Sequence, residues 1–216
     1  MKQSEINSQV LIYASVMLVV IELLTVVVIS QTGLQALLLI GLARITESGI
    51  LLFIISRWGG GLESIGLTRN KVSDGLKKGL IWSAGFGVAS VVTLGILYFL
   101  NFNLFKTFSS SSPSSISGLI PLLIVGGFFS PITEEIFFRG IVYSFLRKWG
   151  IILAILGSAI LFSVVHAAIT GVSFIQVTGS LVFAAAYEVE KNLVVPITIH
   201  VLGNMAIFAL SFLMAL

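Results

Sequence analysis

Long apolar runs separated by short polar segments make up the pattern of this chain. A helix that crosses a bilayer needs about 20 predominantly apolar residues. Seven apolar segments occur in the chain, and most are near this length. They are 10–29, 34–55, 79–100, 118–146, 151–168, 174–187 and 193–216. The pattern predicts an all-α fold, a polytopic transmembrane helical bundle of about seven spans.

The fourth segment, 118–146, is longer than one span requires. As a single helix it would measure about 43 Å, against a hydrocarbon core of about 30 Å. Pro131 offers two solutions. Either the helix kinks there, or a new helix begins with Ser130 as N-cap and Pro131 in its first position.

Basic residues in the polar segments predict the topology. The segment 57–78 carries five basic and two acidic residues, whereas 101–117 is rich in serine and has one lysine. Because cytoplasmic loops carry an excess of Lys and Arg, the first loop is expected inside and the second outside. We therefore predict a multi-pass protein of the cell membrane with a cytoplasmic N-terminus.

Composition strengthens the membrane prediction and limits the partners. The 216 residues are 57% hydrophobic and only 10% charged, with a mean hydropathy of +1.11. The formal net charge is +3, but the basic residues lie between apolar segments, so they indicate topology rather than a nucleic-acid partner. The chain has no cysteine, which excludes disulfides and a thiol nucleophile.

Charged residues inside the first two spans need partners. Arg44 and Glu47 are three residues apart and can pair along one helix, and Glu22 can join them from the neighbouring span. A structural ion pair is the simplest interpretation, and any further role of the three residues stays open.

The segment 130–140 places further charge at bilayer depth. Glu135 and Arg139 are four residues apart, so they share a helix face and can neutralise each other. Glu134 lies about 100° around the helix from Glu135 and has no cation in its own turn. Because intramembrane charge is costly, the unpaired Glu134 is the residue that indicates function.

The two histidines of the chain also lie in apolar segments. His166 is in the fifth, and His200 in the seventh, where Asn204 follows one helical turn later on the same face. Each histidine could be a hydrogen-bonded packing residue. The two histidines, Asn204 and Glu134 together are instead the groups that peptide-bond hydrolysis by activated water needs. The carboxylate can act as the base, and the other side chains can donate hydrogen bonds to the oxyanion. A zinc site of Glu134, His166 and His200 is the alternative.

Three motifs in this order resemble the CPBP intramembrane proteases, also called the Abi or CAAX-protease-and-bacteriocin-processing family, which includes the prenyl-protein protease Rce. The matching residues are Glu134-Glu135-x-x-x-Arg139-Gly140, Phe162-x-x-x-His166 and His200-x-x-x-Asn204. The resemblance divides the chain into an N-terminal transmembrane region, 1–117, and a catalytic transmembrane core, 118–216. It implies an all-helical intramembrane endopeptidase acting on a membrane-associated peptide or protein within the lipid bilayer.

Residue roles follow from the resemblance position by position. Glu134 resembles the general base that activates water, His166 its partner in holding that water, and His200 and Asn204 the oxyanion-hole donors.

Glu135 and Arg139 resemble the supporting pair of the family. The family's mechanism implies no cofactor, with zinc as the less favoured alternative. Some relatives serve instead in bacteriocin immunity or as scaffolds, so a non-catalytic protein of the same fold is the alternative function.

Overall fold

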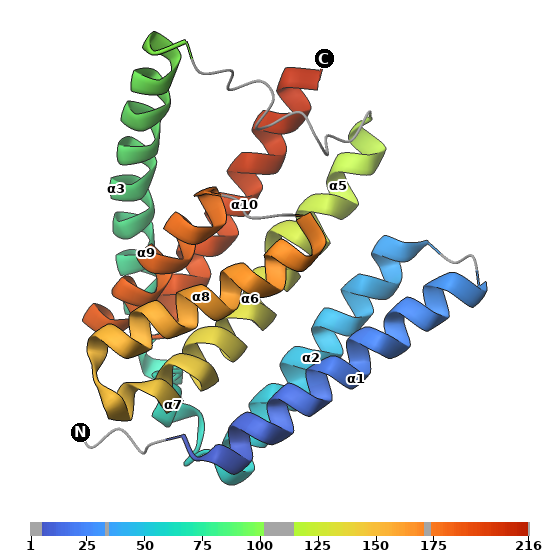
Figure 1. The fold of residues 1–216 in the computed structure, drawn as a ribbon, viewed down its shortest axis with the longest axis vertical. Helices are drawn as coiled ribbons and strands as arrows, with labels where there is room; N and C mark the ends of the chain where they lie inside the picture. Colours follow the sequence, from blue (N-terminus) through green and yellow to red (C-terminus); the bar gives the residue numbers. More distant parts are fainter. Residues whose placement is uncertain (1–5, 33–34, 102–114, 171–173, 216) are drawn as a thin grey trace.

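The computed structural model describes residues 6–32, 35–101, 115–170 and 174–215, and these are almost entirely helical (Figure 1). Two antiparallel helices, α1 (Ser8–Thr32) and α2 (Ala36–Trp58), form one side of the bundle. The turns η1 (Leu62–Ile65) and η2 (Arg69–Lys71) lead to α3 (Val72–Phe99) on the opposite side.

The residues from 116 to 149 form one unbroken helical path. It consists of α5 (Ile116–Ile124), the π-helix η4 (Val125–Phe129), α6 (Ser130–Glu135), the π-helix η5 (Ile136–Tyr143), α7 (Ser144–Leu146) and the 3-10 turn η6 (Arg147–Trp149).

A separate helix beginning with Ser130 as N-cap is therefore wrong as a prediction. Ser130 has helical angles, φ −61° and ψ −49°, whereas an N-cap residue lies outside the helical region. Pro131 cannot donate a main-chain hydrogen bond. The π-helical turns before it already depart from the ordinary i→i−4 pattern, so the helix passes the proline without ending.

Three more helices, α8 (Ile151–Thr170), α9 (Phe174–Glu190) and α10 (Val194–Ala215), complete the bundle. Five helical segments are long and apolar enough to cross a membrane, namely 8–32, 36–58, 62–99, 116–149 and 194–214. The apolar stretch 151–167 and α9 are shorter. The predicted polytopic helical membrane bundle is confirmed, although two of the seven predicted spans are short.

Close packing fixes α3 to the bundle near its first turns. A Cβ atom on Gly75 would lie 2.6 Å from Asn192 Nδ2, and one on Gly79 would lie 2.5 Å from Thr198 Cβ. Side chains at these two positions would force the helices apart. The later part of α3 is highly exposed, ending with Phe99 at 83%.

Glu22, Arg44 and Glu47 pair as the sequence predicts. Arg44 Nη1 binds Glu47 Oε2 at 2.6 Å, and Arg44 Nη2 binds Glu22 across the helix interface. Glu47 is fully buried, whereas the Glu22 side chain is 44% exposed. One guanidinium thus joins the first two helices.

A polar network closes one end of the bundle. Glu188 accepts hydrogen bonds from Arg147 at 2.9 and 3.0 Å, and it also binds the Tyr143 hydroxyl and Lys191. Burial opposes ionisation of this carboxylate, but the bonds from Arg147, Lys191 and Tyr143 outweigh burial and lower the pKa of Glu188 to about 2. The network joins η6 to the end of α9.

The basic turns after α2 and after α7 lie at the same end of the bundle (Figure 1). This arrangement fits the predicted cytoplasmic face. Most of the predicted outer loop, 101–117, lies outside the described residues. The orientation and the division at residue 117 stay predictions.

Candidate active site

Two π-helical segments bracket α6, the short helix that carries Glu134 and Glu135. A π-helical turn re-aims side chains relative to a regular α-helix and occurs frequently at functional sites. Both glutamates therefore lie in the irregular middle part of the 116–149 segment, which is long and apolar enough to cross a membrane.

Glu135 and Arg139 form the ion pair that their spacing predicts. Arg139 Nη1 donates to Glu135 Oε1 at 2.8 Å, and both side chains are fully buried. Arg139 Nη2 also donates to the Ser180 carbonyl at 2.9 Å and to its hydroxyl at 2.8 Å. Arg139 thus links η5 to α9, an interaction that helix spacing cannot predict.

Glu134 has a different environment. Its Oε2 atom lies 3.6 Å from His166 Nε2 and 3.6 Å from His200 Nε2. Oε2 is buried, yet 19% of the Glu134 side chain is exposed. A separation of 3.6 Å is too long for a direct hydrogen bond. The geometry suits a small bridging molecule that can enter from the exposed side.

The partners of the two Nδ1 atoms assign the tautomer of each histidine. His166 Nδ1 lies 2.9 Å from the Phe162 carbonyl, which can only accept a hydrogen bond. His200 Nδ1 lies 2.8 Å from Glu135 Oε1, an atom that already accepts from Arg139. Both Nδ1 atoms therefore carry the proton. When neutral, each histidine presents the bare lone pair of Nε2 to the facing carboxylate.

Asn204 lies beside the π-helix η4. Its Nδ2 atom donates to the Gly126 carbonyl at 3.0 Å. An amide nitrogen has two hydrogens, so a second N–H is left for another acceptor. The structure thus brings Glu134, His166 and His200 together directly, and it places Asn204 one turn along α10 from His200.

Thr133 connects this site to α2. Its hydroxyl donates to the Arg44 carbonyl at 2.9 Å and lies 2.7 Å from the Ser48 hydroxyl. Thr133 precedes Glu134 directly in the chain. Sequence analysis missed these contacts, because nothing in the spacing of residues 85 positions apart signals that two helices meet.

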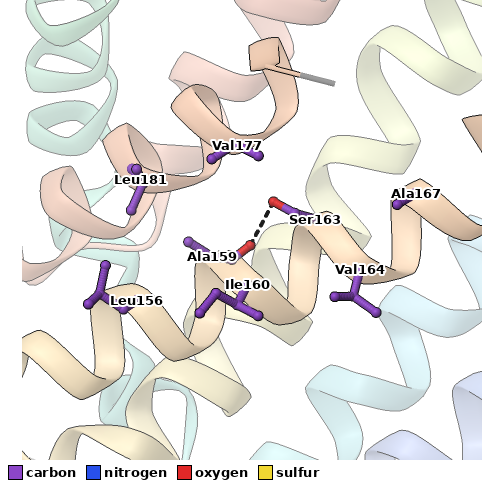
Figure 2. Close-up of a pocket in the computed structure, with 8 residues that line it drawn as sticks. All are labelled: Leu156, Ala159, Ile160, Ser163, Val164, Ala167, Val177 and Leu181. Carbon is purple, nitrogen blue, oxygen red and sulfur yellow. Dashed lines mark hydrogen bonds between the residues drawn. The ribbon is translucent and has the colours of Figure 1, made fainter. Parts of the chain in front are cut away.

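An apolar pocket of about 240 Å³ lies between α8 and α9. Figure 2 shows Leu156 and Ile160 of α8 facing Val177 and Leu181 of α9, while the Ser163 hydroxyl turns back to the Ala159 carbonyl. The pocket lining contains no titratable side chain. It is therefore a surface groove of apolar character, separate from the Glu134 site.

A metal ion needs several converging ligand atoms. Within the part of the chain that the structure describes, no group of three or more His, Cys, Asp or Glu side chains is arranged closely enough to hold one. Glu134, His166 and His200 carry donor atoms of the types that zinc accepts.

Comparison with known proteins supports the resemblance. Residues 116–206 match the family model described as Type II CAAX prenyl endopeptidase Rce1-like. The Bacillus subtilis (strain 168) protein named "Putative membrane peptidase YdiL" is 29% identical to this chain over 143 residues, 63% of this chain and 58% of that relative. This chain therefore spans less than two thirds of the relative's length. No solved structure gives a significant match.

Proposed function

From the Rce1-like domain at residues 116–206, we propose that this chain is an intramembrane endopeptidase that hydrolyses a peptide bond with water activated by Glu134. One observation carries the proposal. The Glu134 carboxylate faces the Nε2 atoms of His166 and His200, each at 3.6 Å. With both histidines neutral, three acceptors converge at this spacing, and a water between them can donate to two of them, which supports a reaction that consumes water.

The general base is Glu134. A water in this position donates one proton toward Glu134 and its second hydrogen bond to His166 Nε2. Its oxygen attacks the peptide carbonyl carbon as Glu134 takes the first proton. The C–N bond then breaks, and the same proton passes to the leaving amine, so the products are a free carboxyl group and a free amine.

The oxyanion of the tetrahedral intermediate needs hydrogen-bond donors. His200 supplies one when it is doubly protonated, because Nδ1–H is held by Glu135 and Nε2–H then points into the site. The second N–H of Asn204 is the other donor. In this mechanism Arg139 holds Glu135 in place.

Zinc bound by Glu134, His166 and His200 is the second candidate mechanism. One feature favours it, because histidines that bind zinc usually donate their other ring N–H to a carbonyl or a carboxylate, as both do here. Zinc would polarise the carbonyl and acidify a bound water. Glu135, however, is engaged by Arg139 and His200, so that mechanism lacks a free general base.

The proposed substrate is a membrane-associated peptide or protein. The exposed part of Glu134 lies in a segment long enough to cross the bilayer, so the scissile bond must reach bilayer depth. No nucleic acid takes part, and the lipid bilayer is the surrounding medium. The proposed orientation places the N-terminus in the cytoplasm.

The decisive experiment compares peptides in three strains of the source organism: a deletion strain, the same strain with the wild-type gene restored, and the strain restored with Glu134→Gln. An endopeptidase predicts uncut precursors that disappear with the wild type and persist with Glu134→Gln. A non-catalytic immunity or scaffold protein predicts that Glu134→Gln, expressed at equal level, restores the wild-type phenotype.

A further inference from the structure

The Arg139 guanidinium lies between two aromatic rings. Its central carbon is 5.2 Å from the centroid of the Phe162 ring and 5.3 Å from that of Phe183. Aromatic faces attract cations, and the attraction is strongest where water is excluded. Arg139 uses its N–H groups for hydrogen bonds to Glu135 and Ser180. The aromatic rings contact the rest of the guanidinium.

Each of these two rings also stacks on one histidine of the candidate site. Phe162 and His166 have centroids 4.1 Å apart and ring planes inclined by 22°. Phe183 and His200 have centroids 4.5 Å apart and an inclination of 23°. The five side chains form one array in the order His166, Phe162, Arg139, Phe183 and His200, and the Phe162 ring also meets the His200 ring at 63°, with centroids 5.8 Å apart.

Phe183 packs against other buried side chains as well as against His200. It is only 6% exposed and belongs to a buried cluster with Val195 and Ile199 of α10. Two aromatic side chains of α3, Trp82 and Phe86, pack against this cluster. A ring supported on several sides cannot tilt freely, so it offers a fixed plane to the imidazole that stacks on it.

We propose that Phe183 is a positioning residue that sets the ring plane of His200. The bond from Nδ1 to Glu135 fixes one point of the imidazole, and the Phe162 ring contacts it at a steep angle, with centroids 5.8 Å apart. The intrinsic barrier to rotation about the bond between Cβ and the ring is nevertheless low. Stacking on Phe183 removes that freedom and keeps Nε2 directed at Glu134. The resulting catalytic role rests on the proposed function, whereas the ring orientation can be measured without it.

Phe162 stacks on His166 as Phe183 stacks on His200, and Phe162 forms part of the motif that contains His166. Phe183 has no such sequence signal. It lies on α9, 17 residues before His200, and reaches it only because α9 folds back against α10. The array therefore adds a residue from α9 to a site that the motifs draw from α6, α8 and α10.

Nuclear magnetic resonance offers a direct test, because the chain contains only two histidines. Protein labelled with ¹⁵N at histidine, in detergent micelles, should give two imidazole patterns, both of the Nδ1-protonated type when neutral. Phe183→Leu should change the tautomer pattern or line width of His200 and leave His166 as in the wild type.

The controls separate stacking from general packing. Phe183→Tyr keeps an aromatic ring and should restore the wild-type His200 pattern. Phe212→Leu removes a ring of similar burial on α10, the helix of His200, about 18 Å further along it. It should leave both patterns unchanged. If Phe183→Leu does not fold, Phe183→Met, which preserves volume without a ring, carries the test.

An unchanged His200 pattern in the folded variant, or an equal change in Phe212→Leu, would overturn the proposal. Where cleavage can be assayed, Phe183→Leu should lower kcat by 10- to 100-fold at nearly constant KM, and Phe183→Tyr should recover it. If the wild type cleaves nothing, the proposed function fails, while the spectra still decide the orientation of His200.

Discussion

Glu134 and Glu135 are adjacent in the chain but belong to different networks. Glu135 is fully buried and binds both Arg139 and His200 at 2.8 Å. Glu134 keeps 19% of its side chain exposed and has its nearest ring nitrogens at 3.6 Å. Oε1 of Glu135 thus binds two protein partners directly, whereas the separations around Glu134 suit a bridging water. Substitutions at the two positions should therefore have different consequences.

Replacing Glu134 by Gln should abolish cleavage and leave the protein folded. Glutamine keeps the size of the side chain but cannot take a proton from water, and removing a carboxylate without a direct hydrogen-bonded partner strands no buried cation. Cleavage and thermal unfolding in detergent should be measured together. Glu63→Gln, in an exposed position, is the matched control. Cleavage by the variant at the wild-type rate would exclude Glu134 as the base.

Replacing Arg139 by Ala should destabilise the protein by about 3 kcal/mol or more, because removal of one partner leaves the buried Glu135 carboxylate uncompensated. The measurement is the midpoint of unfolding, with Lys77→Ala, which removes an exposed cation, as the control. Normal stability together with complete loss of cleavage would instead move Arg139 into the group that carries out the chemistry.

The Glu188 network should contribute stability that depends on pH. The pKa of Glu188 is lowered from 4.5 to about 2, so its contribution is complete above pH 4.5 and is lost as pH falls through about 2. Glu188→Gln should therefore lower Tm at neutral pH, and the difference from the wild type should shrink between pH 4.5 and 2. A difference that stays constant over this range would contradict the assignment.

Topology can be tested with reporter fusions. A reporter fused near Lys71 should behave as cytoplasmic, and one fused near Ser111 as external, since the first loop carries the basic residues. Ser111 lies outside the described residues, and the fusion needs no structure there. The opposite result would place the basic end of the bundle outside the cell.

Metal dependence needs a separate experiment. Purified protein treated with a strong zinc chelator should keep its activity if Glu134 activates water directly. Elemental analysis of the untreated protein gives the zinc content per chain. Activity that disappears on chelation and returns with added zinc, at close to one zinc per chain, would replace the metal-free mechanism and leave the protease proposal standing.

Local spacing predicted the parts of the site that depend on a single helix. The ion pairs of Arg44 with Glu47 and of Glu135 with Arg139 follow from separations of three and four residues. The apolar runs predicted the helices for the same reason, since a bilayer imposes a length and an internal hydrogen-bond pattern on each span.

Apart from the contact of Glu22 with Arg44, contacts between helices could not be predicted in the same way. Ser180, Phe183 and Thr133 reach the site through the packing of separate helices, and one sequence contains no periodic signal for such meetings. Of the two alternatives at Pro131, a new helix capped by Ser130 is the one that the structure contradicts, and the cause is related. Proline normally marks a helix boundary, but the π-helical turns that let the helix continue have no recognisable residue pattern.

The attachment of α3 to the bundle makes the packing around His200 depend on membrane thickness. The apolar part of α3, 79–99, would extend about 32 Å, close to a hydrocarbon core of about 30 Å, so the tilt of the helix depends on the thickness of the bilayer. Gly75 and Gly79 anchor its first turns, and the next side chains inward, Trp82 and Phe86, support the Phe183 cluster. Thinner or thicker lipids would change the tilt of α3 and, through these two side chains, the support of the ring on which His200 rests.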